Sequence, residues 1–178
     1  MQFLKYDIAL LNWVHDHLIS HSIPLLQLIS DTTTYMSIAM AFVVIIIAFL
    51  RKSKRLLWQF FMLISVLLMV LLVSQGIKGL IKRDRPFDTY PNIEKLSTGG
   101  DSSFPSGHTL EAFAMAAALS LLYSRKRITL PVYAWAVMVA YSRVALGVHY
   151  PSDVLAGIVI GTIIGWVVPW IFNKAVPL

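Results

Sequence analysis

The residues best suited to chemistry lie in three short motifs in the second half of the chain. The first runs from Lys78 to Pro86 (KGLIKRDRP), the second is PSGH at 105–108, and the third joins Arg143 to His149 and Asp153. Each motif places cationic, hydroxyl or imidazole groups at the edge of a long apolar stretch, where charge is costly and usually functional. Cations, histidines and a hydroxyl together are typical of a phosphate-binding site.

The PSGH motif predicts the start of a helix that binds an anion. A proline near a helix start loses no hydrogen bond, and the N–H groups of the first turn have no acceptor within the helix. Those donors and the helix dipole attract anions. Gly107 lets a phosphate approach the backbone, Ser106 adds a donor, and His108 lies where it can transfer a proton. The alternative is an ordinary helix cap with a histidine at headgroup level.

His149 and Asp153 form a second candidate pair. Pro151 and Ser152 predict another helix start between them. A carboxylate four residues from a histidine can accept the ring N–H, which fixes the tautomer and raises nucleophilicity. The alternative is a capping aspartate beside an interfacial histidine.

Lys78, Arg85 and Arg143 supply positive charge. Fixed cations stabilise the charge on a transferring phosphoryl group, and arginine binds phosphate with two parallel hydrogen bonds. Lys82 and Arg83 fit better as residues at a helix end whose side chains reach toward the headgroups. The motifs hold too few carboxylates and histidines for a metal site, so we expect neither a metal nor a cofactor.

The composition predicts that these motifs are positioned by membrane helices. The chain has 178 residues, of which 57% are hydrophobic and 13% charged, with a mean hydropathy of +0.71 and no cysteine. A soluble domain is about a quarter charged. Stretches long enough to span a bilayer, or nearly so, cover residues 24–50, 56–77, 104–123, 128–146 and 154–172.

Residues 1–22 alternate apolar and polar groups at helical spacing, which predicts a helix lying in the interface. A sixth span there is less favoured because Lys5, Asp7 and Asp16 interrupt it. We therefore predict an all-α, polytopic membrane helical bundle with five to six transmembrane helices and an N-terminal interfacial helix. Gly157, Gly161 and Gly165 predict a close-packed seam in the last span.

Two basic loops predict the orientation. Arg51–Arg55 and Arg125–Arg127 lie on the same side of a five-span model, which the positive-inside rule assigns to the cytoplasm. All three motifs then face outward. The net charge of +6 is explained by lipid headgroups and a phosphorylated substrate, and no nucleic-acid motif accompanies it.

Taken together, the three motifs resemble the signature of the type 2 phosphatidic acid phosphatase superfamily, which also includes bacterial acid phosphatases and vanadium haloperoxidases. The resemblance covers residues 78–153 in the expected order. It implies that His149 attacks phosphorus to form a phosphohistidine, that Asp153 orients it, and that His108 acts as the acid and then the base. It also implies a metal-free phosphate site formed by Lys78, Arg85, Ser106, Gly107 and Arg143.

The expected function is that of a lipid phosphatase, a single integral-membrane domain acting at the outer face of a bacterial inner membrane. The resembling bacterial proteins act on undecaprenyl diphosphate, phosphatidylglycerophosphate, phosphatidic acid or lipid A. The short outer loops favour undecaprenyl diphosphate, with lipid A next. A lipid-to-lipid phosphotransferase or a non-catalytic anion-binding membrane protein is the alternative, and a haloperoxidase is disfavoured by the hydropathy. Glu111, Asp31, Asp88, Tyr90 and Glu94 are left without a role.

Overall fold

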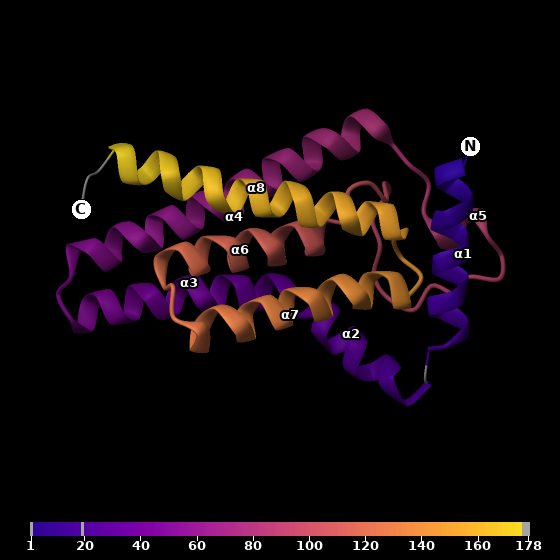
Figure 1. Ribbon diagram of the computed structural model, residues 1–178, viewed down its shortest axis with the longest axis horizontal. Helices are drawn as coiled ribbons and strands as arrows, with labels where there is room; N and C mark the ends of the chain where they lie inside the picture. The colour runs from indigo at the N-terminus through magenta and orange to yellow at the C-terminus, as the bar shows by residue number, and fades with distance from the viewer. Residues whose placement is uncertain (1, 19, 176–178) are drawn as a thin grey trace.

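The protein is a bundle of helices that run side by side, with one helix set across an end (Figure 1). The computed structural model describes residues 2–18 and 20–175, and their side chains between residues 5 and 174. In chain order the helices are α1 (Gln2–Asp16), the 3-10 turn η1 (Ser20–Ser22), α2 (Ile23–Asp31), α3 (Thr33–Leu50), α4 (Lys54–Ile81), the short α5 (Pro86–Thr89), α6 (Gly107–Leu122), α7 (Lys126–Ala145) and α8 (Pro151–Ala175).

Helix α6 lies in the middle of the bundle, in contact with α3, α4, α7 and α8 (Figure 1). Its small side chains explain this central place, because Ala112, Ala114 and Ala116–Ala118 are fully buried and let neighbouring backbones approach closely. The glycines of α8 have the same effect on the facing side. A Cβ on Gly157 would lie 2.9 Å from the Ser106 carbonyl oxygen, and Cβ atoms on Gly161 and Gly165 would overlap the carbonyls of Leu110 and Ala114. The predicted glycine seam is confirmed as the α6–α8 contact.

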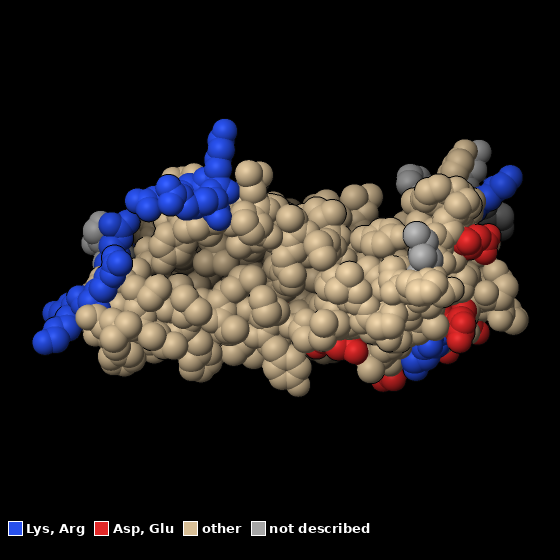
Figure 2. Space-filling view, turned by 90° about the horizontal axis from the view of Figure 1, so that it is seen from below, with Lys and Arg blue, Asp and Glu red and all other residues tan. Residues whose placement is uncertain are grey.

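The structure describes four helices long and apolar enough to cross a membrane, α3, α4, α7 and α8. The fifth predicted span is the shorter apolar helix α6. Large apolar side chains such as Phe42, Leu72 and Trp170 are exposed on the outside of the bundle. In Figure 2 most of the visible face between the two ends carries no charged side chain. Lys and Arg gather toward one end, and Asp and Glu lie in the half toward the other. This is an all-α integral membrane protein, as predicted.

The first predicted span is wrong in its first part, because the helix breaks at Thr32. The Thr32 hydroxyl donates to the Leu28 carbonyl (2.6 Å), and the Thr33 hydroxyl donates to the carbonyls of Ile29 (3.1 Å) and Ser30 (2.9 Å). Hydroxyls that bond to the preceding turn favour bends and ends in helices. The result is a short helix α2 that leaves the bundle direction at the end where α1 lies (Figure 1).

Helix α1 runs across the end of the bundle, as the predicted interfacial helix would (Figure 1). Leu11 and Val14 are buried against α7 and the loop that follows it, whereas Tyr6 and Trp13 are 72% and 60% exposed. Aromatic side chains of this kind are favoured at headgroup level. Met1 and Ile19, which belong to the segment predicted as interfacial, lie outside the described residues.

Candidate active site

The three motifs meet at the end of the bundle where α6 and α8 begin. A cavity of about 300 Å³ opens there. Of the candidate residues, all but Ser106 and Asp153 line it, and the 95–100 loop contributes the rest of its wall. The lining residues are Lys78, Arg85, Thr98, Gly99, Gly100, Gly107, His108, Arg143 and His149.

His149 is held in the loop between α7 and α8, and only 1% of its surface is exposed. The loop turns at Gly147, whose φ of +71° suits glycine. The His149 Nδ1 lies 2.7 Å from the Ser103 carbonyl oxygen. Because a carbonyl can only accept, Nδ1 carries the proton and Nε2 keeps its lone pair. This Nε2 lies 3.5 Å from Nη1 of Arg85.

The surroundings of His149 keep the imidazole neutral. Burial lowers its pKa well below the ordinary value of 6.5, and the nearby cations Arg143, Arg85 and Lys78 lower it further. The hydrogen bond to Ser103 acts in the opposite direction and is the weaker influence. A neutral imidazole with an unprotonated Nε2 is the form that can act as a nucleophile.

Asp153 lies beside His149, but the ring N–H points elsewhere. Its Oδ2 is 3.6 Å from His149 Nδ1 and accepts the Tyr150 N–H at 3.0 Å, while its Oδ1 accepts from Arg83 at 2.6 Å. The sequence predicted that this carboxylate accepts the ring N–H, whereas the structure gives that hydrogen bond to Ser103. Asp153 therefore faces the imidazole as a neighbouring negative charge.

Arg85 forms hydrogen bonds with main-chain carbonyls of the segments around the cavity. Its Nε donates to Gly100 (2.5 Å), Nη1 to Val148 (2.8 Å) and Nη2 to Ser102 (3.1 Å). An arginine has five N–H groups. Three bond to these carbonyls, the second N–H of Nη1 faces His149 Nε2 at 3.5 Å, and the second N–H of Nη2 is left for an anion in the cavity. Arg85 is 2% exposed, which makes this remaining donor strong.

Arg143, which also lines the cavity, is held by hydrogen bonds as well. It donates to the hydroxyls of Ser30 and Ser97 and, at 2.9 Å, to the Thr98 carbonyl. Within the described part of the chain its buried Nε has no hydrogen-bond partner. A buried donor without an acceptor is costly, and an anion in the cavity can supply one.

The start of α6 brings Gly107, His108 and Lys78 together. A Cβ on Gly107 would lie 3.7 Å from the Lys78 Nζ, so the ammonium approaches the helix start closely. Ser106 is placed differently from the prediction, because its buried hydroxyl pairs with the Thr109 hydroxyl at 2.8 Å and does not line the cavity. The donors at this helix start are therefore the main-chain N–H groups.

Arg83 is not a helix-end residue reaching toward headgroups, as the sequence suggested. It bridges two carboxylates, Asp7 at 2.7 Å and Asp153 at 2.6 Å. Sequence reasoning missed both Arg83 and Asp7. The signal that could have found Asp7 is a carboxylate set among the apolar residues of the first helix, because buried charges are almost always paired.

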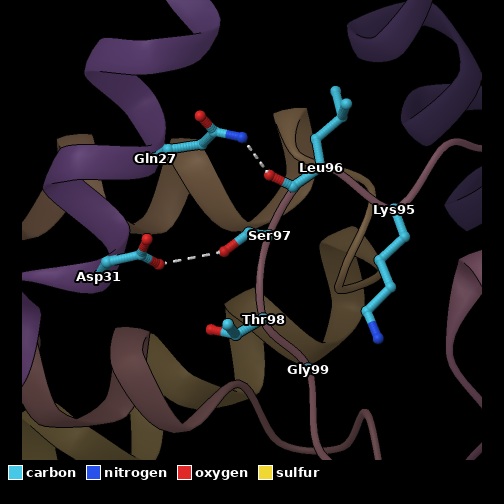
Figure 3. Close-up of a pocket in the computed structure, with 7 residues that line it drawn as sticks. All are labelled: Gln27, Asp31, Lys95, Leu96, Ser97, Thr98 and Gly99. Atoms are coloured by element: carbon cyan, nitrogen blue, oxygen red, sulfur yellow. Dashed lines mark hydrogen bonds between the residues drawn. The ribbon is translucent and has the colours of Figure 1, made fainter.

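A second hollow, of about 430 Å³, adjoins the cavity and shares Thr98 and Gly99 with it. Figure 3 shows Gln27 and Asp31 reaching from α2 to the 95–99 loop, where Gln27 donates to the Leu96 carbonyl (2.7 Å) and Asp31 accepts from Ser97 (3.3 Å). Among the residues left without a role, Asp31 therefore lies beside the site.

The other unassigned acidic residues lie apart from the cavity lining. Glu111 accepts from Thr34 at 2.9 Å, between α6 and α3. Asp88 and Glu94 are exposed. Among the described residues no group of histidine and carboxylate side chains could hold a metal ion. The donor-rich cavity is suited to an anion with several acceptor oxygens, such as phosphate.

Comparison with curated proteins finds bacterial lipid phosphatases. The chain is 39% identical over 92 residues to a lipid A 1-phosphatase of Rhizobium johnstonii, a match that covers 49% of this chain and 37% of the relative. It is 33% identical over 76 residues to the undecaprenyl-diphosphatase BcrC of Bacillus subtilis, which covers 43% and 38%. The chain thus matches little more than a third of the length of these relatives.

Two solved structures share the fold. One is a transmembrane PAP2-type phosphatidylglycerolphosphate phosphatase from Bacillus subtilis, with a TM-score of 0.82 and 22% identity over 97% of this chain and 87% of that one. The other is LpxE of Aquifex aeolicus, with a TM-score of 0.77 and 21% identity over 92% and 94%. The model of the PAP2 superfamily matches residues 59–177, which include every motif residue described above. This chain belongs to the PAP2 superfamily.

Proposed function

We propose that this protein is a lipid phosphatase that works through a phosphohistidine on His149. The observation that carries the proposal is the hydrogen bond from Nδ1 to the Ser103 carbonyl, which leaves a neutral Nε2 at the cavity beside Arg85. The relatives described above include a lipid A 1-phosphatase and an undecaprenyl-diphosphatase, which supports the reaction class.

The first step forms a bond between His149 Nε2 and phosphorus. The lone pair of Nε2 attacks, the bond from phosphorus to the lipid-side oxygen breaks, and that oxygen takes a proton from His108. Arg85, Arg143, Lys78 and the main-chain N–H groups at the start of α6 stabilise the charge on the remaining phosphoryl oxygens.

The second step releases phosphate. Water gives a proton to His108 and attacks phosphorus, and the nitrogen–phosphorus bond breaks with its electron pair returning to Nε2. His108 thus acts as the acid and then as the base. Asp153 contributes a negative charge that stabilises the imidazole while it carries positive charge. These steps use no metal and no cofactor.

The preferred substrate is undecaprenyl diphosphate, at the outer face of a bacterial inner membrane. The site lies at the end of the bundle opposite the basic loops, and in Figure 2 Lys and Arg gather at that opposite end. The positive-inside rule assigns the basic end to the cytoplasm. A site at the end of a membrane-spanning bundle suits a substrate whose tail stays in the bilayer.

Lipid A is the second candidate, because the cavity continues into the hollow lined by Gln27, Asp31 and Ser97. Carboxylate, amide and hydroxyl groups there can bind the polar part of a sugar headgroup. Transfer of the phosphoryl group to a second lipid would use the same histidines and differ only in its acceptor.

The test is phosphate release by purified protein in excess EDTA, from undecaprenyl diphosphate, lipid A, phosphatidylglycerophosphate and phosphatidic acid. We expect release by the wild type and by His21→Ala, a matched change at an exposed histidine, and none by His149→Ala. The preferred lipid identifies the substrate. Equal release by His149→Ala, or loss of release with EDTA, would overturn the metal-free phosphohistidine mechanism.

A further inference from the structure

A buried carboxylate from α1 reaches the catalytic loop from outside the motifs. Asp7 is only 7% exposed. Its Oδ2 accepts from Arg83 Nη2 at 2.7 Å and from the Ser152 hydroxyl at 2.5 Å, and its Oδ1 accepts the Ser152 N–H at 2.8 Å. Both carboxylate oxygens of Asp7 therefore accept hydrogen bonds. Of the two donor residues, Ser152 precedes Asp153 in sequence and Arg83 bonds to Asp153 directly.

The contact with Ser152 fixes the start of α8. This helix begins at Pro151, so the Ser152 N–H belongs to its first turn and has no acceptor within the helix. A side chain of the same helix end normally caps such a group. Here Asp7, 145 positions away in sequence, provides the cap and places negative charge at the positive end of the helix dipole. Asp153 is the next residue of that turn.

Arg83 connects Asp7 to Asp153 directly. Its Nη1 donates to Asp153 Oδ1 (2.6 Å) and to the Ser152 hydroxyl (2.7 Å), and its Nη2 donates to Asp7. Its guanidinium carbon lies 3.9 Å from the centre of the Tyr150 ring. Because the same guanidinium bonds to both carboxylates, the position of Asp153 depends on the carboxylate of Asp7.

We propose that Asp7 is a positioning residue of the phosphohistidine centre, holding Arg83 and Ser152 so that Asp153 stays beside His149. The proposal rests on the phosphatase function proposed above. Asp7 does not line the cavity, so it acts through its neighbours and not on the substrate. It also lies outside residues 59–177, the part matched by the family model, so the N-terminal helix completes the site.

The charge balance gives the proposal a second consequence. Asp7, Arg83 and Asp153 together carry one net negative charge, which favours positive charge on the imidazole of His149. The other groups around that imidazole are cations or a second histidine, on α4, the loop after it, α6 and α7: Lys78, Arg85, His108 and Arg143. Neutralising Asp7 therefore makes the imidazole harder to protonate.

The test compares Asp7→Asn with Asp16→Asn, an exposed carboxylate on the same helix. Asparagine keeps the shape and can still accept the Ser152 N–H, but it has no charge for Arg83. We expect Asp7→Asn to lower kcat about tenfold, with KM within about twofold of the wild type. Asp7→Glu, which keeps the charge, should recover part of the loss, and Asp16→Asn should match the wild type. Each phosphate-release rate is divided by the concentration of sites that form phosphohistidine. A variant that yields less folded protein therefore does not have a lower kcat for that reason alone.

A measurement without turnover separates this proposal from the proposed function. In full-length protein with ¹⁵N-labelled histidine, Asp7→Asn should shift the titration of His149 to lower pH, and Asp16→Asn should leave it unchanged. An unchanged titration, or kcat equal to the wild type, would overturn the role of Asp7. If the wild-type protein releases no phosphate from any lipid, while Asp7→Asn still shifts the titration of His149, the phosphatase function is overturned and the positioning of His149 by Asp7 stands.

Discussion

Arg85 holds two segments of chain together before any substrate arrives. Its three carbonyl partners lie in the loop before α6 and in the loop before α8. A lysine carries its donors on a single atom and cannot reach three acceptors set in a fork. We therefore expect Arg85→Lys to lower kcat/KM about 100-fold, measured as phosphate release under substrate-limited conditions.

The matched change is Arg51→Lys, at an exposed position in the loop at the opposite end of the bundle. It keeps the net charge equal to that of Arg85→Lys, and its kcat/KM should equal the wild-type value. If Arg85→Lys kept a third or more of the wild-type kcat/KM, positive charge alone would account for the contribution of Arg85 to activity.

The pKa of His149 gives a second prediction about a single residue. Burial and the surrounding cations lower this pKa below 6.5, so the folded protein keeps the imidazole neutral as the pH falls through 6.5. The same residue in the denatured chain becomes protonated there. Histidine NMR of folded and denatured protein, assigned with His149→Gln, checks this order. A folded-state midpoint at or above the denatured one would contradict it.

The sequence predicted most of the side chains that meet at the cavity but not the groups that hold them. The cations and histidines were predictable because charge is rare in this chain and clusters in three motifs. The Ser103 carbonyl that fixes His149 was not, because every residue has a carbonyl and sequence does not show which one faces the ring. Asp7 was missed because its partners lie more than seventy positions away.

Among the elements, α6 and α8 begin at the candidate site and make the most extensive contact with each other. His108 lies in the first turn of α6 and Asp153 in the first turn of α8, and the glycine seam sets the distance between the two helices. A Cβ on Gly161 would overlap the Leu110 carbonyl. We expect Gly161→Ala to destabilise the protein by about 2 kcal/mol, because overpacking forces the backbones apart. Thermal unfolding in detergent, followed by tryptophan fluorescence, measures this change.

The control for the seam is Gly76→Ala in α4, where a Cβ would have nothing within 4 Å. Alanine is the better helix former, so this variant should unfold at or above the wild-type temperature. Equal unfolding temperatures for Gly161→Ala and the wild type would show that the α6–α8 contact adapts.

Hydropathy predicted the spanning helices well and their ends less well. The second to fifth predicted spans correspond to α4, α6, α7 and α8. The first span failed because residues 24–50 were predicted as one helix, while the hydroxyls of Thr32 and Thr33 end one helix and start another. Local hydrogen bonds of this kind are invisible to an average over a window of residues.

For the whole molecule, the charge distribution predicts how it lies in the membrane. Basic residues gather at one end in Figure 2, and the candidate site lies at the other. The chain has no cysteine, so single cysteines report position cleanly. In intact cells we expect a membrane-impermeant maleimide to label Glu94→Cys, near the site, and not Ser124→Cys, in the loop between α6 and α7. Labelling of Ser124→Cys alone would reverse the orientation.

The carbonyl groups that bind Arg85 and Arg143 also affect how the sequence of this protein can evolve. Arg85 and Arg143 grip the 98–102 loop through the backbone of Thr98, Gly100 and Ser102. Since every amino acid has the same main-chain carbonyl, side chains in this loop can be substituted without losing these hydrogen bonds. Gly99 is the exception, because a Cβ there would lie 3.0 Å from Nη1 of Arg85. The loop is thus a place where new substrate preferences can arise while the proposed phosphate chemistry stays unchanged.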